Sequence, residues 1–237
     1  MIKNKKLIMV VPAYNEEGKI GEVVRKAITR APFLDKVLVV DDGSKDNTSA
    51  EAREAGAEVL KHTTNTGAGG AIRSGCEYAA EHGYDIIVVI AGDDQDDPAF
   101  VEALVKPIID EDYDFIQGSR YLYGKLDIPK FRLIATRGYS VVFSLAARKW
   151  ITDASNGFRA YKTSILQTID LRQKWLEQYE LEPYLLLQSI KKGFKFKEVP
   201  VPKYWPKGKS YSKMVPFKSW WSISRPIFYS MIQGKGK

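Results

Sequence analysis

Apolar residues recur along this chain in short blocks that alternate with stretches of helical spacing. The blocks are four to six residues long and rich in valine, isoleucine and leucine, and several end abruptly in polar residues. Such blocks are typical of strands buried on both faces of a parallel sheet. The predicted strands are residues 7–12, 36–40, 58–61, 86–91, 115–118 and 196–201, the last of them at an edge.

Between these blocks, apolar residues spaced three or four positions apart predict amphipathic helices. Strand and helix alternate four times in the first half of the chain, which favours an α/β fold with a doubly wound, mainly parallel sheet. Residues 122–132 lack a period and are interpreted as a loop, and residues 152–166 as a turn followed by strand or helix. The predicted helices are 20–30, one within 46–56, 71–82, 99–110, 133–150, 176–191 and 216–233.

The C-terminal stretch differs in character from the rest. Residues 202–214 are broken by prolines, Gly208 and lysines, which predicts a loop. Apolar spacing in residues 216–233 predicts an amphipathic helix, kinked or restarted at Pro226. It either docks on the core of the protein or lies on a membrane surface. We therefore expect one α/β domain over residues 1–201 and a basic aromatic loop and amphipathic tail over residues 202–237.

Charge is distributed unevenly along the 237 residues. The net charge is +7, but residues 191–237 hold eleven lysines, one arginine and one glutamate, a net +11 that leaves −4 for the preceding residues. Three of the five tryptophans also lie in this tail: Trp205, Trp220 and Trp221. A basic aromatic segment suits nucleic acid, a membrane surface or a phosphorylated substrate, or is only a solvated face.

Two further features narrow the class of protein. The single cysteine, Cys76, excludes an internal disulfide. No apolar run reaches the roughly 18 residues that a membrane-spanning helix needs, so the chain is not expected to cross a bilayer by itself. The acidic first part and the absence of a recognisable module argue against nucleic-acid binding.

Four aspartates, Asp93, Asp94, Asp96 and Asp97, follow the strand predicted at 86–91. In an open α/β sheet, ligands bind in the crevice beyond the carboxyl ends of the strands, where this cluster is expected. Carboxylates so close together repel one another unless a cation neutralises them, and a divalent metal with hard oxygen ligands would do so. Alternatively, the cluster only complements the dipole of the next helix.

Two earlier strands end in comparable polar sets, PAYNEE at residues 12–17 and DDGSKDNT at 41–48. Together with AGDDQDD at 91–97, their order and spacing resemble glycosyltransferase family 2, inverting enzymes with a nucleotide-diphospho-sugar transferase (GT-A) fold. The resemblance covers roughly residues 7 to 200. GSRY at 118–121 and TDASNGFRAY at 152–161 are similar to its polyprenyl-phosphate branch, of the dolichyl-phosphate mannose synthase type.

The resemblance implies where the nucleotide binds. The first loop would cradle base and ribose, the aspartate pair would meet the base edge, and the glycine-rich segment 65–75 would lie near the diphosphate. A dinucleotide fingerprint is excluded there, because it needs glycine where the chain has Ile72. The implied nucleotide-binding residues are Pro12, Tyr14, Asn15, Glu16, Asp41, Asp42, Gly69, Arg73, Gly92 and Asp93.

The family's D-x-D metal motif is only partly present. Aligned on the glutamine and proline that follow the motif, the chain has Ala91 at the first aspartate and Asp93 at the second. Asp93 and Gln95 are then the expected ligands of Mg²⁺ or Mn²⁺, which would neutralise the leaving diphosphate. Because Ala91 stands at the first aspartate of the motif, an alternative function is binding of nucleotide sugars without catalysis.

The branch binds its acceptor phosphate with arginines, because one guanidinium can donate two parallel hydrogen bonds to a phosphate. The implied function is inverting sugar transfer to polyprenyl phosphate; the alternative acceptor is a sugar hydroxyl of a glycan or glycolipid, which needs a general base. We expect a cytoplasmic protein, with peripheral attachment to the cytoplasmic face of an anionic membrane and no nucleic-acid partner. The candidate catalytic residues are Asp93, Asp153 and Glu180, and the candidate acceptor-binding residues are Arg120, Arg132, Lys209, Ser210 and Lys213.

Overall fold

A mixed sheet of seven strands organises the part of the chain that the structure describes. The structure is a computed structural model that describes residues 2, 4–124, 130–204 and 218–233. The strands lie in the order β3-β2-β1-β4-β6-β5-β7, with β6 antiparallel to both of its neighbours. Their bounds are β1 Leu7–Ala13, β2 Lys36–Asp41, β3 Glu58–Lys61, β4 Ile86–Val89, β5 Phe115–Ser119, β6 Arg159–Lys162 and β7 Phe196–Pro200.

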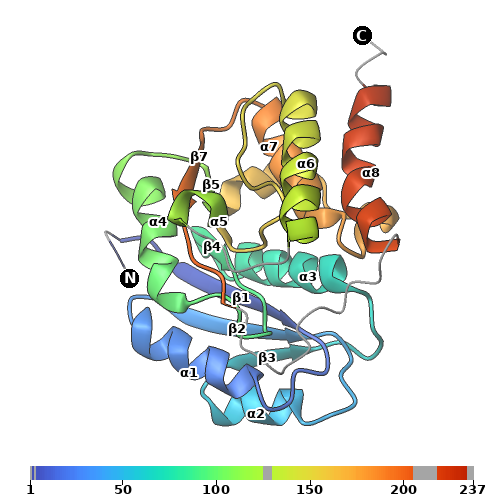
Figure 1. Cartoon of the computed structure of the whole chain (residues 1–237). Helices are drawn as coiled ribbons and strands as arrows, with labels where there is room; N and C mark the ends of the chain where they lie inside the picture. Colours follow the sequence, from blue (N-terminus) through green and yellow to red (C-terminus); the bar gives the residue numbers. More distant parts are fainter. Residues whose placement is uncertain (1, 3, 125–129, 205–217, 234–237) are drawn as a thin grey trace.

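Helices cover both faces of this sheet (Figure 1). Ile8 and Val10 of β1 point into one core and Met9 and Val11 into the other, and all four are fully buried. This alternation explains why the strand reads as a continuous apolar run. The first core is closed by α3 (Ala68–Glu81), α6 (Lys130–Ala147), α7 (Leu181–Lys191) and α8 (Lys218–Gln233), and the second by α1 (Ile20–Arg30), α2 (Thr48–Glu54) and α4 (Val101–Asp110).

The prediction of a doubly wound, mainly parallel α/β sheet is confirmed. Strands β1 to β4 are parallel to one another, and β7 lies at the edge, as expected. The ambiguous stretch 152–166 contains both alternatives, β6 and a 3₁₀ helix, η2 (Thr163–Gln167). Because β6 inserts antiparallel between β4 and β5, the site at the end of β4 gains a neighbour that the strand pattern did not predict.

Three predicted boundaries are wrong for identifiable reasons. The predicted loop 122–132 contains the end of a short helix, α5 (Arg120–Tyr123), and the start of α6. Helix α3 begins at Ala68, three residues early, because its glycine-rich first turn packs against another segment of the chain. Helix α7 begins at Leu181 rather than 176, which places Pro183 in the first turn, where its missing N–H has no partner to lose. The 3₁₀ helices η1 (Pro98–Phe100) and η3 (Lys174–Leu176) precede α4 and α7.

The C-terminal helix docks on the protein. Ile223 and Ile227 of α8 are 9% and 2% exposed within the first core, and α8 packs against α6 and α7 (Figure 1). The helix continues through Pro226 rather than restarting there. Most of the predicted loop 202–214 lies outside the described residues. In the described ranges, none of the helices has the length and apolarity needed to span a membrane.

Candidate active site

The carboxyl ends of β2, β1 and β4 lie side by side, so the three polar sets that follow these strands meet as predicted. Hydrogen bonds join the first two sets directly. The Asn15 amide donates to Ser44 Oγ at 2.9 Å, and the Glu16 amide donates to Thr48 Oγ1 at 2.8 Å. The predicted site therefore lies beyond the carboxyl ends of neighbouring parallel strands, where α/β proteins bind ligands.

The loop after β1 contains the residues that are predicted to contact base and ribose. Pro12 lies near the end of β1, Tyr14 is half-buried, and Asn15 takes a φ of 51°, which asparagine tolerates. The Asn15 side-chain oxygen accepts from the Lys45 amide at 3.0 Å. Glu16 is 7% exposed and pairs with Lys19 at 3.0 Å. These contacts fix the loop on the loop that follows β2.

The aspartate pair at the end of β2 is buried and bonded within the protein. Asp41 accepts from the Ser44 amide and Ser49 Oγ. Burial raises the pKa of Asp41, but these hydrogen bonds outweigh it and leave the pKa below 3.8. Asp42 accepts from the Gly67 amide at 2.7 Å. The pair thus fastens the glycine-rich segment, and its predicted contact with the base edge stays a prediction.

His62 is a member of this network that the sequence did not indicate. Its Nδ1 lies 2.8 Å from Asp42 Oδ1, and its Nε2 lies 3.0 Å from Ser74 Oγ on α3. Thr66 also donates to Asp42, from its amide at 2.8 Å. A histidine one residue past β3 carries no motif, so only the fold could reveal this contact.

The glycine-rich segment opens α3 beneath residues 176–178. Gly67 has a φ of 91°, and a Cβ at Gly69 would collide with the carbonyl oxygen of Leu176. Glycine is therefore required here by a close approach of two backbones. Arg73 lies one turn further along α3. It lines a hollow described below, and its Nη2 would lie 3.9 Å from a Cβ at Gly70, so its predicted place near the diphosphate stays a prediction.

Three of the four clustered aspartates are neutralised by basic residues of the protein. Nitrogen–oxygen distances are 2.8 Å for Lys26 to Asp94, 2.7 Å for Arg30 to Asp97 and 2.7 Å for Lys203 to Asp96. The pairs of Asp94 and Asp97 tie the loop to α1. The Lys203–Asp96 pair is buried, and it brings the residues after β7 over the loop, where the Tyr204 amide donates to the Gln95 carbonyl at 2.9 Å.

Asp93 stands apart from this pattern, because the described residues give it no ion pair. It is half-buried, and its Oδ1 accepts from the Gln95 amide at 3.2 Å. Burial raises the pKa of Asp93, while the charge of Lys203 opposes the rise. Gly92 precedes it where a Cβ would lie 3.2 Å from the Pro12 carbonyl oxygen, which brings this loop against β1.

Arg120 and Asp153 form a buried ion pair across the ends of β5 and the 152–158 turn. Arg120 Nε and Nη2 each lie 2.7 Å from an oxygen of Asp153, and Asp153 is fully buried. Nη2 also donates to Ser155 Oγ at 2.7 Å. Burial lowers the pKa of Arg120, but the charge of Asp153 outweighs it and raises the pKa above its ordinary value. Beneath the pair, Glu198 accepts from the amides of Thr152 and Asp153.

Helix α6 carries two further arginines, Arg132 and Arg137. Arg132 is half-buried in the first turn of α6. Arg137, one and a half turns later, lies with its guanidinium carbon 5.1 Å from the ring centroid of Tyr121, and Arg120 lies 5.9 Å from the same centroid. Tyr121 is hydrogen-bonded to Thr136 of α6. Arg137 was missed by the sequence reasoning, although it shares a helix with Arg132. The remaining acceptor-binding candidates, Lys209, Ser210 and Lys213, lie outside the described residues.

Two glutamates at the start of α7 are also paired. Glu180 is 3% exposed, and its Oε1 lies 3.1 Å from Nη1 of Arg225 on α8. Glu182 Oε1 lies 3.4 Å from Arg159 Nε, and burial raises the pKa of Glu182. Glu180 and Asp153, the two candidate bases, are thus both buried carboxylates that face an arginine.

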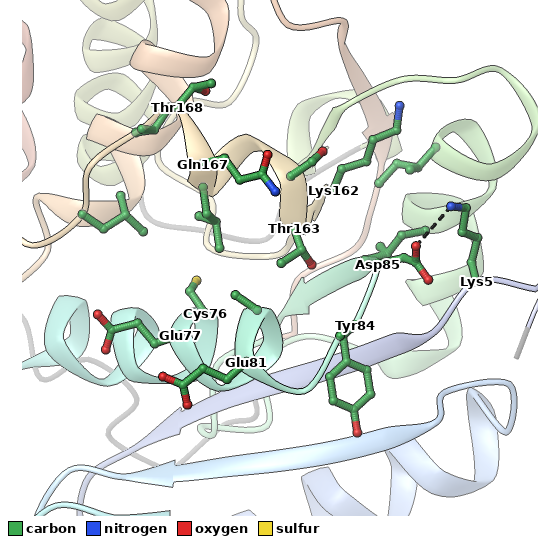
Figure 2. Close-up of a pocket in the computed structure, with 18 of the residues that line it drawn as sticks. Lys5, Cys76, Glu77, Glu81, Tyr84, Asp85, Lys162, Thr163, Gln167 and Thr168 are labelled. Carbon is green, nitrogen blue, oxygen red and sulfur yellow. Dashed lines mark hydrogen bonds and ion pairs between the residues drawn. The ribbon is translucent and has the colours of Figure 1, made fainter.

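A hollow of about 1220 Å³ lies elsewhere, at the amino ends of β1 and β4 between α3 and η2 (Figure 2). Two lysines of its walls are paired: Lys5 with Asp85 at 3.1 Å and Lys162 with Asp112 at 2.7 Å. Cys76 lines it but is 1% exposed, and burial raises the pKa of its thiol to about 12. The hollow therefore offers neither a free charge at these positions nor a reactive thiol.

Comparison with known proteins places this geometry in a family. The model described as "Glycosyl transferase family 2" matches residues 8–170. The UDP-N-acetylglucosamine–dolichyl-phosphate N-acetylglucosaminyltransferase of Methanococcus voltae is 30% identical over 217 residues, covering 84% of this chain and 85% of that protein. The polyprenol monophosphomannose synthase of Mycolicibacterium smegmatis is 28% identical over 205 residues, covering 83% and 77%.

Among solved structures, glucosyl-3-phosphoglycerate synthase from Mycobacterium tuberculosis in complex with uridine diphosphate has a TM-score of 0.70. The match covers 97% of this chain and 80% of that chain at 20% identity, so it shows a shared GT-A fold. The family model spans more than half of the 237 residues. The chain therefore belongs to glycosyl transferase family 2 and is a glycosyltransferase.

Proposed function

We propose that this glycosyltransferase moves a sugar, with inversion, from a nucleotide-diphospho-sugar to polyprenyl phosphate. The observation that best supports this proposal is that both candidate bases are held in ion pairs. Asp153 is held by Arg120 and Glu180 by Arg225, both within buried ion pairs. A hydroxyl acceptor needs a base to take its proton, whereas a phosphate acceptor is already ionised. Paired carboxylates therefore favour the phosphate, and the names of the two relatives agree with this choice.

The donor would lie across the three strand ends. We assign base and ribose to the loop after β1, with Tyr14, Asn15 and Glu16, and the diphosphate to the space between the glycine-rich segment and Asp93. The second loop is held in place by Asp41. Because these loops are already bonded to one another, little ordering would be needed when the nucleotide binds.

The residues present fit a divalent cation whose coordination shell would be completed by the donor. No cluster of three histidine, cysteine or acidic side chains suited to a metal occurs among the described residues. Asp93, however, is the one aspartate of the four without an ion pair in that part of the chain, and the neighbouring Asp96 has a buried oxygen, Oδ1, without a hydrogen bond. Asp93 and Gln95 would hold Mg²⁺ or Mn²⁺ together with diphosphate oxygens, and the cation would neutralise the leaving group.

On the acceptor side, the arginines would orient the phosphate. Arg137 supplies positive charge beside Tyr121, Arg132 lies earlier on the same helix, and Arg120 is held in one orientation by Asp153. An oxygen of the acceptor phosphate attacks the anomeric carbon from the face opposite the nucleotide. The new carbon–oxygen bond forms as the bond to the diphosphate breaks, and the nucleoside diphosphate leaves with that electron pair.

The test is transfer of labelled sugar from UDP- and GDP-sugars to a short polyprenyl phosphate, with the unphosphorylated polyprenol and a glycan as parallel acceptors. We expect product with the phosphate alone. Arg132→Met should raise the acceptor KM about tenfold, through loss of a charge-assisted contact, and leave the donor KM unchanged. Transfer to the glycan would establish the hydroxyl alternative, and nucleotide binding without transfer to any acceptor would establish a binding protein.

We further propose that the outer faces of α6 and α8 attach the protein to an anionic membrane at its cytoplasmic face. Exposed apolar residues recur at spacings of seven and four on α6 and at a spacing of seven on α8, so on each helix they share one side. The inner sides carry buried residues, and the two helices lie side by side (Figure 1). The exposed residues are Ile134, Val141, Leu145, Trp221 and Phe228.

Basic residues border this apolar surface, which favours a lipid surface over a second copy of the chain. Arg137 is exposed on α6, and Arg148 and Lys149 are exposed where the helix ends. Each would add about 1 kcal/mol of attraction to anionic headgroups. In this reading, α8 acts with α6 rather than as a separate anchor, and it serves both to dock and to attach.

Leu145 and Trp221, 73% and 61% exposed, allow a direct test. The double variant Leu145→Glu with Trp221→Glu should lose co-sedimentation with vesicles that contain anionic lipid, at unchanged Tm. Ile28→Glu, a 43% exposed position on α1 beyond the other face of the sheet, is the matched control and should still bind. Equal binding of both variants, or a dimer in sedimentation velocity that only the double variant loses, would contradict the proposal.

A further inference from the structure

One short segment, residues 174–180, lies between the C-terminal helix and the glycine-rich segment of the site. On the side of the site, the Gly70 amide donates to the Glu177 carbonyl oxygen at 3.0 Å. A Cβ at Gly67 would collide with that same carbonyl oxygen, and one at Gly69 with that of Leu176. The two backbones are therefore in direct contact, and the position of one limits the position of the other.

On its other side, segment 174–180 is fastened to α8 by three contacts. The Tyr179 amide donates to Ser222 Oγ at 3.2 Å. The rings of Trp175 and Tyr229 stack with centroids 4.6 Å apart. Arg225 lies 3.1 Å from Glu180 and places its guanidinium carbon 5.6 Å from the Trp175 ring centroid.

Of these contacts, the ion pair between Arg225 and Glu180 is the most important for the position of the segment. Glu180 is 3% exposed, and its second oxygen accepts from the Gln178 amide at 3.1 Å. A buried carboxylate is tolerated when a cation and hydrogen bonds satisfy it. Without Arg225 the buried carboxylate of Glu180 would be left unpaired and would move toward solvent. Residues 177–180 would move with it, away from the glycines.

We propose that Arg225 is a positioning residue for the donor: through Glu180 it holds segment 174–180 on the glycine-rich segment and so keeps the diphosphate site formed. The inference rests on the proposed function, which assigns the diphosphate to that segment. It assigns Glu180 to the same role rather than to proton transfer. It also links the helix that would meet the membrane to the loop that would hold the nucleotide.

The test separates donor from acceptor kinetics in the full chain. Arg225→Met should raise the KM for the nucleotide sugar about tenfold, the effect of one charge-assisted contact, with the acceptor KM unchanged. Glu180→Gln should do the same, and the double variant should be no worse than either, because both changes break one contact. Arg172→Met is the matched control, because its pair with Glu77 is exposed, and its donor KM should not change.

Two outcomes would overturn the inference. A lower Tm for R225M with an unchanged ratio of donor KM to acceptor KM would make the pair merely structural. If R225M does not fold, Arg225→Lys, which keeps the charge, gives the same readout with a rise of about threefold. Binding of UDP and GDP with Mn²⁺, measured by calorimetry, separates the two proposals. A wild-type chain that binds neither refutes the proposed function as well, whereas equal binding by wild type and R225M refutes only the role of Arg225.

Discussion

Replacing Asp93 with asparagine is expected to abolish sugar transfer while raising the Tm of the ligand-free protein. Turnover should fall about a hundredfold or more, the scale seen when a group that stabilises developing charge is removed. The opposite effect on stability follows from burial, which raises the pKa of Asp93 and so makes its ionised form unfavourable in the folded state. The gain should be a rise in Tm, in the direction that this pKa shift sets.

The stability gain should depend on pH in a defined direction. Because the folded protein binds the Asp93 proton more tightly than the unfolded chain, the wild type loses stability as pH rises from the ordinary value of 3.8 through the raised pKa. The difference in Tm between D93N and wild type should therefore be larger at pH 7 than at pH 5. Thermal melts without metal or nucleotide measure it.

Asp94→Asn provides the matched control for this prediction. Asp94 has a φ of 61°, which asparagine also adopts, and its side chain pairs with Lys26 while 24% exposed. The variant should keep turnover and lose less than about 1 kcal/mol of stability, as for other partly exposed pairs. If instead D94N is inactive and D93N is active, Asp94 is the metal ligand and the alignment on Gln95 is wrong.

Replacing Asp153 with asparagine should destabilise the protein more than any other single change considered. The guanidinium of Arg120, with its side chain 11% exposed, would lose the carboxylate that both Nε and Nη2 contact. Removing one partner of a buried ion pair leaves an uncompensated charge and costs about 3–5 kcal/mol. The Tm should fall by roughly 6–20 °C, measured by calorimetry.

The double variant Asp153→Leu with Arg120→Met separates pairing from function. Removing both charges should recover most of the stability, because no buried ion is left alone. Transfer should remain lost if Arg120 orients the acceptor phosphate. Glu111→Gln is the control for charge removal, since its pair with Lys197 is exposed on both sides and should contribute less than about 1 kcal/mol. A stable and fully active double variant would remove Arg120 from the acceptor site.

Much of the architecture was determined by local pattern. The apolar blocks that end at Pro12, Val40 and Ala91 are short and continuous, which predicts strands that are buried on both faces of a sheet. Once these strands are parallel neighbours, their polar ends must meet, so the place of the candidate site followed from the sequence. The strand β6 did not follow, because a four-residue antiparallel strand after an irregular turn has too few residues to show a period.

The partners of the charged side chains were decided by the tertiary structure alone. Asp93, Asp94, Asp96 and Asp97 are equivalent in the sequence, yet Lys26, Arg30 and Lys203 arrive from distant segments and neutralise three of them. In the same way Arg225 reaches Glu180 across 45 positions. The sequence by itself determines which groups gather at the ends of the strands, since periodicity and strand order are local properties. Which carboxylate remains without an ion pair, and is therefore available to a ligand, depends on contacts between segments far apart in the chain. These contacts exist only once the chain has folded.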